Sequence, residues 1–185
     1  MSRRIGSTFC ILFAFVSAAL TYPAMAQTVA NGSYYATPAW DQTLPANVRF
    51  IVLSNFENKA VLDRDTGLVW ERSPDSTLFN LAEANEHCNK LAIAGRLGWR
   101  LPGIQDLASL IDVSTTLILP ISGPRLRAGH PFVVSNGLYW STTRFTFDAF
   151  TAWLVNMATG DVGGDFWQGM RQAMYVRGGP AADMQ

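Results

Sequence analysis

The first 26 residues contain the three parts of a secretory signal peptide, and this feature most constrains what the remaining chain can be. Arg3 and Arg4 precede an apolar stretch at residues 9–20, and Ala-Met-Ala at 24–26 gives the small-residue pattern of a cleavage site. The apolar stretch is shorter than the about 20 residues that a membrane-spanning helix needs. We therefore expect cleavage after Ala26 and a periplasmic or secreted protein without a transmembrane anchor; an uncleaved anchor is the alternative.

Cleavage would leave a single cysteine, Cys88, in a chain of 159 residues, because 26 of the 185 residues are removed. An exported chain with one cysteine cannot form an intramolecular disulfide, so either its hydrophobic core stabilises it or the cysteine pairs between chains. The remaining chain has 12 basic and 14 acidic side chains and no basic cluster. This composition argues against nucleic-acid binding, and the length suits one domain.

The first part of the expected domain has strand patterns. Residues 27–47 contain scattered proline, glycine and polar residues and are predicted to form an extended lead-in. Residues 48–53 are apolar and β-branched, which predicts the first strand. Two apolar runs at 60–63 and 68–71 flank Asp-Thr-Gly at 65–67, where the glycine can take a positive φ. These runs predict a hairpin.

Two helices are predicted next. Asn80 and Glu83 have the spacing of a capping box, and the apolar residues that follow have helical spacing and end before Gly95. Pro102 suits the first turn of a second, shorter helix. The apolar positions of the first helix are Leu81, Ala84, Cys88, Leu91 and Ala92.

The rest of the chain combines a long loop with further strands. Residues 114–136 hold three prolines and two glycines and predict an irregular loop, which in a compact domain is often functional. Residues 138–144 and 152–157 are strand-like, with a turn at 158–161 before another paired segment. Residues 174–177 predict a last short strand. Together these patterns predict an α+β domain.

Five motifs in this order resemble the DUF1566 family, which includes the C-terminal domain of the Legionella collagen-like adhesin. The resemblance covers roughly residues 60–178. The motifs are Asp-Thr-Gly-Leu-Val-Trp at 65–70, a helix with an inner Cys88, Gly95 with Trp-Arg-Leu-Pro at 99–102, Tyr-Trp-Ser-Thr-Thr-Arg at 139–144, and Tyr-Val-Arg at 175–177.

The resemblance implies a C-type-lectin-like fold, with two helices packed on a twisted, mainly antiparallel sheet and a long irregular loop. It implies a single domain at 48–178 and a flexible tail at 179–185. The best-described members of the family are surface-binding domains for sulfated polysaccharides. The resemblance also implies structural roles for Cys88, Trp70, Trp99, Arg100, Pro102, Trp140 and Tyr175.

The chain departs from the family at two positions. The family commonly has a cysteine before the final Val-Arg, which looks like the disulfide partner of the helix cysteine, and this chain has Tyr175 there. We expect Tyr175 to pack against Cys88 instead. Gly103 stands where the family often has a threonine or serine helix cap, and glycine caps less effectively.

The sequence contains no recognisable catalytic motif. Glu83 and His87 are spaced to share a helix face, which could serve a metal, but we favour a solvated face. His130 lies in the long loop and is interpreted as a loop residue. Cys88 belongs to the apolar stripe, which favours burial over the exposure that a nucleophile needs. We therefore expect a non-catalytic protein with no catalytic residue and no cofactor.

Aspartates near the C-terminal end raise the alternative of a calcium site. Asp148, Asp161 and Asp165 could together supply carboxylate oxygens to calcium, which binds six to eight oxygens. No familiar calcium-lectin motif accompanies them, so we favour turn capping by these side chains.

Tryptophan and arginine residues are the ligand-binding candidates. Trp70, Trp99, Trp140 and Trp153 are interpreted mainly as core, whereas Trp167 lies in a polar, turn-rich segment and is predicted to be exposed. Aromatic faces and guanidinium groups are suited to holding sugars and acidic groups. The predicted ligand-binding residues are Trp167, Arg171, Arg144 and Asp165.

Three functions are compatible with these patterns. The favoured one is an exported, non-catalytic binding module for glycans or for a cell-surface or envelope partner. An envelope structural or assembly protein is the second, with the same fold making oligomer contacts. An enzyme on a lectin-like scaffold is the third, and it would require acid and base groups that converge in a pocket.

Overall fold

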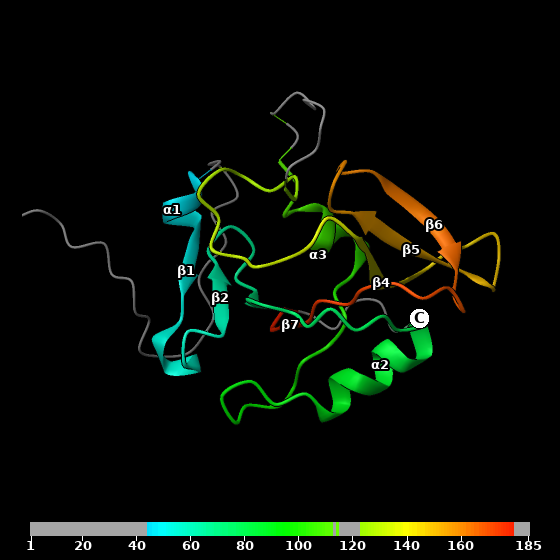
Figure 1. Ribbon diagram of the computed structural model, residues 1–185, viewed down its shortest axis with the longest axis horizontal. Coiled ribbons are helices and arrows are strands. Elements are labelled where there is room, and N and C mark those ends of the chain that lie inside the picture. The colour runs from blue at the N-terminus through cyan, green and yellow to red at the C-terminus, as the bar shows by residue number, and fades with distance from the viewer. Residues whose placement is uncertain (1–43, 113, 115–122, 180–185) are drawn as a thin grey trace, which may run out of the picture.

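The α+β class is confirmed by the computed structural model, which describes residues 44–112, 114 and 123–179 (Figure 1). The expected signal peptide, most of the lead-in, part of the long loop and residues 180–185 lie outside the described residues. Within the described residues, no helix has the length and apolar character needed to cross a bilayer.

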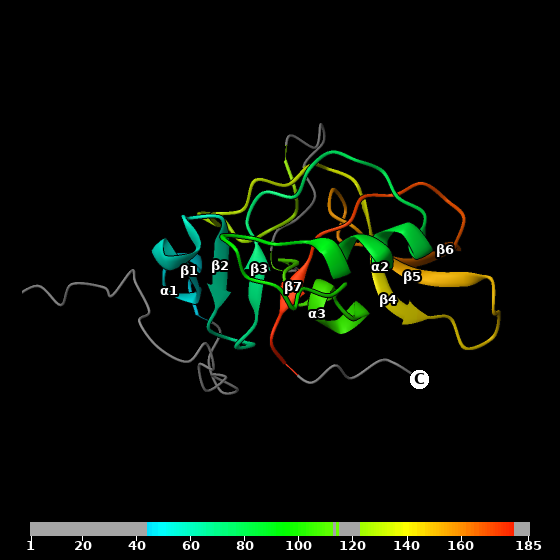
Figure 2. The ribbon, with the colours of Figure 1, turned by 90° about the horizontal axis from the view of Figure 1, so that it is seen from below.

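Among the described residues, seven strands form two antiparallel sheets, where the sequence predicted one sheet. One sheet has the order β1-β2-β3-β7 and the other has the order β4-β5-β6. Figures 1 and 2 show the two sheets towards opposite ends of the molecule, with β7 between β3 and the second sheet. The strands are β1 Phe50–Val52, β2 Ala60–Asp63, β3 Val69–Glu71, β4 Leu138–Arg144, β5 Thr151–Asn156, β6 Val162–Phe166 and β7 Val176–Arg177.

The predicted hairpin is confirmed, and the predicted first strand is shorter than expected. β2 and β3 pair antiparallel around a turn in which Gly67 has a φ of 73°, a conformation that favours glycine. A short helix, α1 (Ala46–Arg49), occupies the end of the expected lead-in and the first two positions of the expected strand. β1 therefore begins only at Phe50.

The first predicted helix is α2 (Leu81–Lys90), and its capping box is confirmed. The Asn80 side chain accepts the Glu83 N–H at 2.9 Å, and the Glu83 carboxylate accepts the Asn80 N–H at 2.9 Å. The helix ends five residues before Gly95, whose φ of 71° serves a turn after the helix. Ala92 is consequently exposed, where the sequence predicted that it would face the core.

The second predicted helix is the short α3 (Ile104–Ala108), with Gly103 at its N-cap. Two other side chains supply the cap that glycine lacks. Asp106 accepts the Gly103 N–H, and the Thr143 hydroxyl accepts the Ile104 N–H at 3.0 Å. Arg100 forms an ion pair with Asp106 at 3.0 Å, which ties the preceding segment to the helix.

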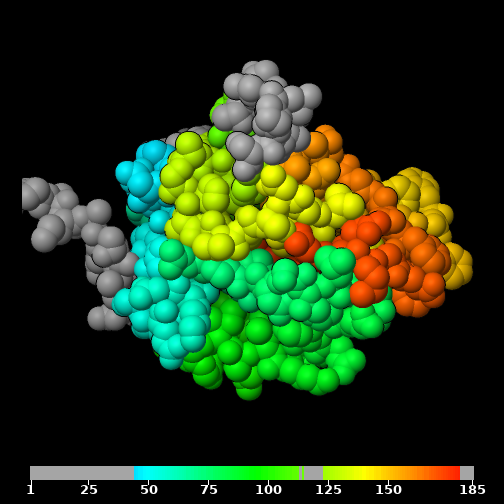
Figure 3. Space-filling model, viewed as in Figure 1, coloured from blue at the N-terminus to red at the C-terminus, as the bar shows by residue number. Residues whose placement is uncertain are grey.

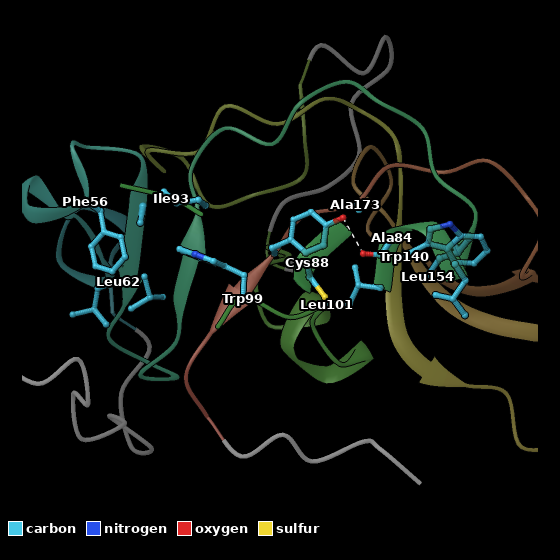
Figure 4. Packing of buried hydrophobic residues seen from close by; sticks show 14 of the residues in the cluster. Phe56, Leu62, Ala84, Cys88, Ile93, Trp99, Leu101, Trp140, Leu154 and Ala173 are labelled. Atoms are coloured by element: carbon cyan, nitrogen blue, oxygen red, sulfur yellow. Dashed lines mark hydrogen bonds between the residues drawn. The ribbon is translucent and has the colours of Figure 1, made fainter. Parts of the chain in front are cut away.

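Two hydrophobic clusters hold the sheets and helices together. Trp140 and Trp99 lie in one cluster and Trp70 lies in the other, which confirms the core placement of these three tryptophans. Figure 4 shows Trp140 beside Leu154 at one end of the first cluster and Trp99 towards the other end. Pro102 is also buried, as expected of a structural residue.

Tyr175 and Cys88 belong to the same buried cluster, in agreement with the expected packing. The Tyr175 hydroxyl donates a hydrogen bond to the Ala84 carbonyl of α2 at 3.1 Å. Burial raises the pKa values of both the Tyr175 hydroxyl and the Cys88 thiol. A tyrosine thus connects the last strand region to α2 through a side-chain hydrogen bond.

A buried ion pair joins α1 to the β2–β3 hairpin. Arg49 and Asp63 make two hydrogen bonds, Nε to Oδ1 at 2.8 Å and Nη2 to Oδ2 at 2.7 Å. Asp63 is fully buried, and its carboxylate also accepts the Asp65 N–H and the Thr66 hydroxyl. Arg49 donates a further bond to the Ser109 carbonyl after α3.

The described part of the long loop packs onto the second hydrophobic cluster. Leu126 and Phe132 are buried there, and Leu126 forms a β-bridge with Ile111. Arg125 donates backbone and side-chain hydrogen bonds to the β5–β6 region at Met157 and Thr159. Residues 123–136 therefore cover the core, and no residue of this segment lines the pocket described below.

Candidate binding site

A pocket of about 210 Å³ lies between the start of α2 and the loop that joins β4 to β5. It is smaller than the about 300–1,000 Å³ typical of sites for drug-sized ligands, which favours a partner that inserts one small group. The space-filling view places the β4–β6 segments, coloured gold to orange, at one end of the molecule (Figure 3). The lining residues are Leu81, Ala82, Asn85, Arg144, Ala149, Phe150, Thr151 and Trp167.

The pocket brings together two of the four predicted ligand-binding residues, Arg144 and Trp167. Arg144 is the last residue of β4, and its exposed side chain has no hydrogen-bond or ion-pair partner within the part of the chain that the structure describes. Trp167 follows β6 and is half-buried, where the sequence predicted exposure. It therefore offers one part of its ring to the pocket and packs the rest against the core.

Backbone hydrogen bonds fix Trp167 between α2 and the β4–β5 loop. Its N–H donates to the Phe150 carbonyl at 2.8 Å, and its carbonyl accepts the Leu81 N–H of α2 at 2.9 Å. Leu81 is itself buried in the core. The position of Trp167 in the pocket is thus fixed by backbone bonds to α2 and to the β4–β5 loop, which form the other two sides of the pocket.

Exposed aromatic side chains lie on the β4–β5 loop and at the end of β6, the two segments that carry Phe150 and Trp167 of the pocket. Phe150 is 59% exposed and Phe166 is 48% exposed, and their ring centroids are 6.3 Å apart. Phe166 lies equally close to Trp167, at 6.3 Å. Phe147 at the tip of the loop is 91% exposed. Large exposed apolar side chains that cluster in this way are typical of a binding surface.

The other two predicted ligand-binding residues, Arg171 and Asp165, bind each other and do not line the pocket. The Asp165 Oδ2 atom accepts from Arg171 Nε at 2.7 Å and lies 2.5 Å from Nη2. The Arg171 backbone also bridges to Phe79, just before α2. The ion pair joins residues on either side of Trp167 in the sequence and thereby restricts the conformation of the segment between them.

The aspartates considered for calcium serve other contacts in the structure. Asp148 accepts the Phe150 N–H and the Thr151 hydroxyl, and Asp161 accepts the Thr159 hydroxyl. These are the turn contacts that the sequence favoured. The described residues contain no group of three or more histidine, cysteine or acidic side chains placed to hold a metal ion.

The comparisons with known proteins support one part of the resemblance found in the motifs, the likeness to the C-terminal domain of the collagen-like adhesin. The Lcl C-terminal domain family matches residues 59–178, which is most of the described chain. The chain belongs to the Lcl C-terminal domain family. No curated protein is similar enough to be identified as a relative.

Cys88 and the two histidines of this Lcl C-terminal domain are not among the residues that line the pocket. The Cys88 thiol is buried and donates to the Asn85 carbonyl. His130 lies in the described part of the loop, where burial lowers its pKa. His87 differs from the prediction of a solvated face, because its ring stacks on Tyr175 with centroids 5.3 Å apart and lies tilted against Phe79 with centroids 5.0 Å apart.

Glu71 at the end of β3 is an ionisable group that the sequence did not single out. Burial raises the pKa of Glu71 to about 7, against an opposing hydrogen bond from the Tyr175 backbone. Its Oε2 atom is buried and has no hydrogen-bond partner among the described residues. The folded domain therefore favours the protonated form of this carboxyl group.

We predict that the Glu71→Gln variant loses a pH dependence that the native domain has. A folded-state pKa above the ordinary 4.5 stabilises the protonated form, so this contribution is complete below pH 4.5 and is lost as the pH rises through 7. The loss is at most about 3 kcal/mol. Urea unfolding of both proteins from pH 4.5 to 8 measures it, and parallel stability curves would contradict the prediction.

Several lining residues were missed because no single-sequence pattern marked them. Ala82 and Asn85 lie outside the apolar stripe of the helix, and only the tertiary structure places them against the β4–β5 loop. The sequence around Phe150 does contain a pattern that could have predicted an exposed apolar site. The segment from Phe145 to Phe150 places three phenylalanines between two predicted strands, where turn residues are usually polar.

Proposed function

We propose that this Lcl C-terminal domain is an exported, non-catalytic binding module that holds an anionic glycan on a surface outside the cytoplasm. The observation that carries the proposal is the placement of Arg144 and Trp167 in one pocket. A guanidinium group without a protein partner can bind a sulfate or carboxylate through two hydrogen bonds. The adjacent indole provides an apolar surface for a sugar ring.

Family membership supports the same function. The family takes its name from the C-terminal domain of a collagen-like adhesin, and an adhesin binds partners outside the cell. The signal-peptide pattern at residues 1–26 is consistent with that location. The small volume of the pocket suits one unit of a polysaccharide, with the exposed phenylalanines as contacts for neighbouring units.

Binding to a panel of sulfated, carboxylated and neutral oligosaccharides tests the proposal. We predict that the native domain binds acidic members and that Arg144→Gln and Trp167→Ala each weaken binding by about tenfold, or about 1.4 kcal/mol. Arg64→Gln is the matched control, because Arg64 is an exposed arginine on the β2–β3 hairpin, outside the pocket.

Two outcomes would contradict the proposal. One is equal binding of neutral and acidic oligosaccharides, which would remove the role of Arg144. The other is an equal loss of affinity in Arg64→Gln and Arg144→Gln, which would indicate general charge attraction without a defined site.

A further inference from the structure

The pocket between α2 and the β4–β5 loop has polar groups on both of these sides. Besides the indole of Trp167, the lining residues with polar side chains are Asn85, Arg144 and Thr151. Asn85 belongs to α2, Arg144 ends β4 and Thr151 begins β5. A guanidinium group can only donate hydrogen bonds, so Asn85 and Thr151 decide what else a ligand must offer besides its acidic group.

The side-chain amide of Asn85 is held in one orientation by the helix. Its Nδ2 atom donates a hydrogen bond to the Leu81 carbonyl, four residues earlier, at 2.9 Å. The nitrogen and the oxygen of an amide lie on opposite sides of Cγ, so this bond turns Oδ1 away from the helix backbone. Oδ1 accepts no hydrogen bond from the described residues and stays accessible to solvent. Asn85 therefore offers a hydrogen-bond acceptor to the pocket.

The Thr151 hydroxyl group also offers an acceptor. It donates its proton to Asp148 Oδ2 at 2.6 Å, so only its oxygen lone pairs are available to a ligand. The Asp148 carboxylate also accepts the Phe150 N–H, which holds the carboxylate in place. The pocket thus combines the donor Arg144 with acceptors on α2 and on β5.

We propose that Asn85 Oδ1 accepts a hydrogen bond from a hydroxyl group of the same sugar unit whose acidic group binds Arg144. This inference rests on the proposed function and makes it more specific. The pocket volume of about 210 Å³ suits one unit of a polysaccharide, so the acidic group and the hydroxyl group belong to one unit. Asn85 then selects acidic units with a free hydroxyl group over units that lack it.

Loss of water from the pocket strengthens this selection. Leu81, Phe150 and Trp167 give the pocket apolar sides, so a ligand that fills it displaces water from Asn85 Oδ1. A ligand without the hydroxyl group provides no donor in exchange, and an acceptor left without a partner costs free energy. For this reason, a site that hydrogen-bonds a hydroxyl group discriminates against the analogue without it.

NMR titration of the processed chain with single sugar units tests the inference. The parent probes are methyl glucuronide and methyl glucoside sulfated at its primary hydroxyl, and in each analogue one ring hydroxyl is replaced by hydrogen. We expect the native chain to bind at least one analogue about fivefold more weakly than its parent. Asn85→Ala should bind the parent about fivefold more weakly, and it should bind that analogue as tightly as the native chain does.

Asn89→Ala is the matched control, because Asn89 is an exposed asparagine of the same helix outside the pocket. It should bind every probe like the native chain. Alanine favours the helix more than asparagine does, so neither substitution should unfold α2. Asn85→Asp is a test of proximity, since it places a carboxylate near the acidic group of the ligand. It should weaken binding of the parents more than Asn85→Ala does.

Three outcomes overturn the inference and leave the proposed function intact. One is unchanged affinity of Asn85→Ala for the parents. Another is an equal loss of affinity for the parents and for every analogue, which would mean that Asn85 only shapes the pocket. The third is native affinity in Asn85→Asp. If the native chain binds neither acidic parent, the proposed function fails together with the inference.

Discussion

Asp63→Asn is expected to destabilise the domain by about 3–5 kcal/mol, because it leaves a buried arginine without its main counter-charge. Arg49 and Asp63 are both buried and make two hydrogen bonds with each other. The substituted amide would keep the volume of the side chain and lose its charge. Asp65 at 3.1 Å from Arg49 Nε would be the remaining carboxylate.

Paired variants separate the charge effect from a loss of packing. Arg49→Met combined with Asp63→Asn should be more stable than Asp63→Asn alone, since a buried charge without a partner costs more than the absence of both charges. Arg64→Gln, at the exposed neighbouring position, should change the free energy of unfolding by less than about 0.5 kcal/mol. Chemical denaturation measures all four proteins, and a loss below about 1 kcal/mol in Asp63→Asn would contradict the prediction.

Trp140→Ala is the second substitution with a large expected effect, a loss of about 3–5 kcal/mol. The Trp140 side chain is fully buried in the first hydrophobic cluster, and its Nε1–H donates to the Phe79 carbonyl at 2.8 Å. Truncation would leave a cavity and would remove a bond that holds the segment before α2. This segment sets the position of the helix wall of the pocket.

The Trp140→Phe variant distinguishes packing from hydrogen bonding. It keeps an aromatic ring in the core and leaves the Phe79 carbonyl without its donor, so we expect an intermediate loss of about 1–3 kcal/mol. Phe147→Ala is the control, because Phe147 is 91% exposed, and its stability should match that of the native domain. Equal stability of Trp140→Ala and Phe147→Ala would be incompatible with the core described above.

Local patterns predicted the elements of this fold where short-range chemistry decides them. The capping box before α2 and the glycine of the β2–β3 turn depend on a few neighbouring residues, and both are confirmed. The end of α2 was predicted too late, because the apolar spacing continues beyond Lys90 into residues that turn away from the helix. Spacing alone does not indicate where a helix stops.

Long-range pairing explains what the sequence could not predict. The division of the strands into two sheets depends on pairings such as β3 with β7, which are more than 100 residues apart. The contact between Arg49 and Asp63 joins α1 to the end of β2, and no pattern in the sequence around either residue predicts this ion pair. The pocket arises in the same way, since α2 and the β4–β5 loop are far apart in the sequence and only the tertiary structure brings them together.

The aromatic and cationic candidates were therefore correct in type and only partly correct in arrangement. Trp167 and Arg144 share the pocket, whereas Arg171 and Asp165 form an ion pair beside it. Counting residue types along the chain does not distinguish an arginine with an internal carboxylate partner from one that is available to a ligand.

Nitrogen-resolved NMR of the tryptophan indoles, during titration with an acidic oligosaccharide, tests the central claim most directly. The account predicts that the Trp167 indole signal shifts on saturation, that the signals of the buried Trp70, Trp99 and Trp140 stay unchanged, and that Arg144→Gln raises the ligand concentration at half-maximal shift by about tenfold. A bound oligosaccharide that leaves the Trp167 signal unmoved, or that moves it at the same concentrations in Arg144→Gln, would contradict the pocket as the binding site.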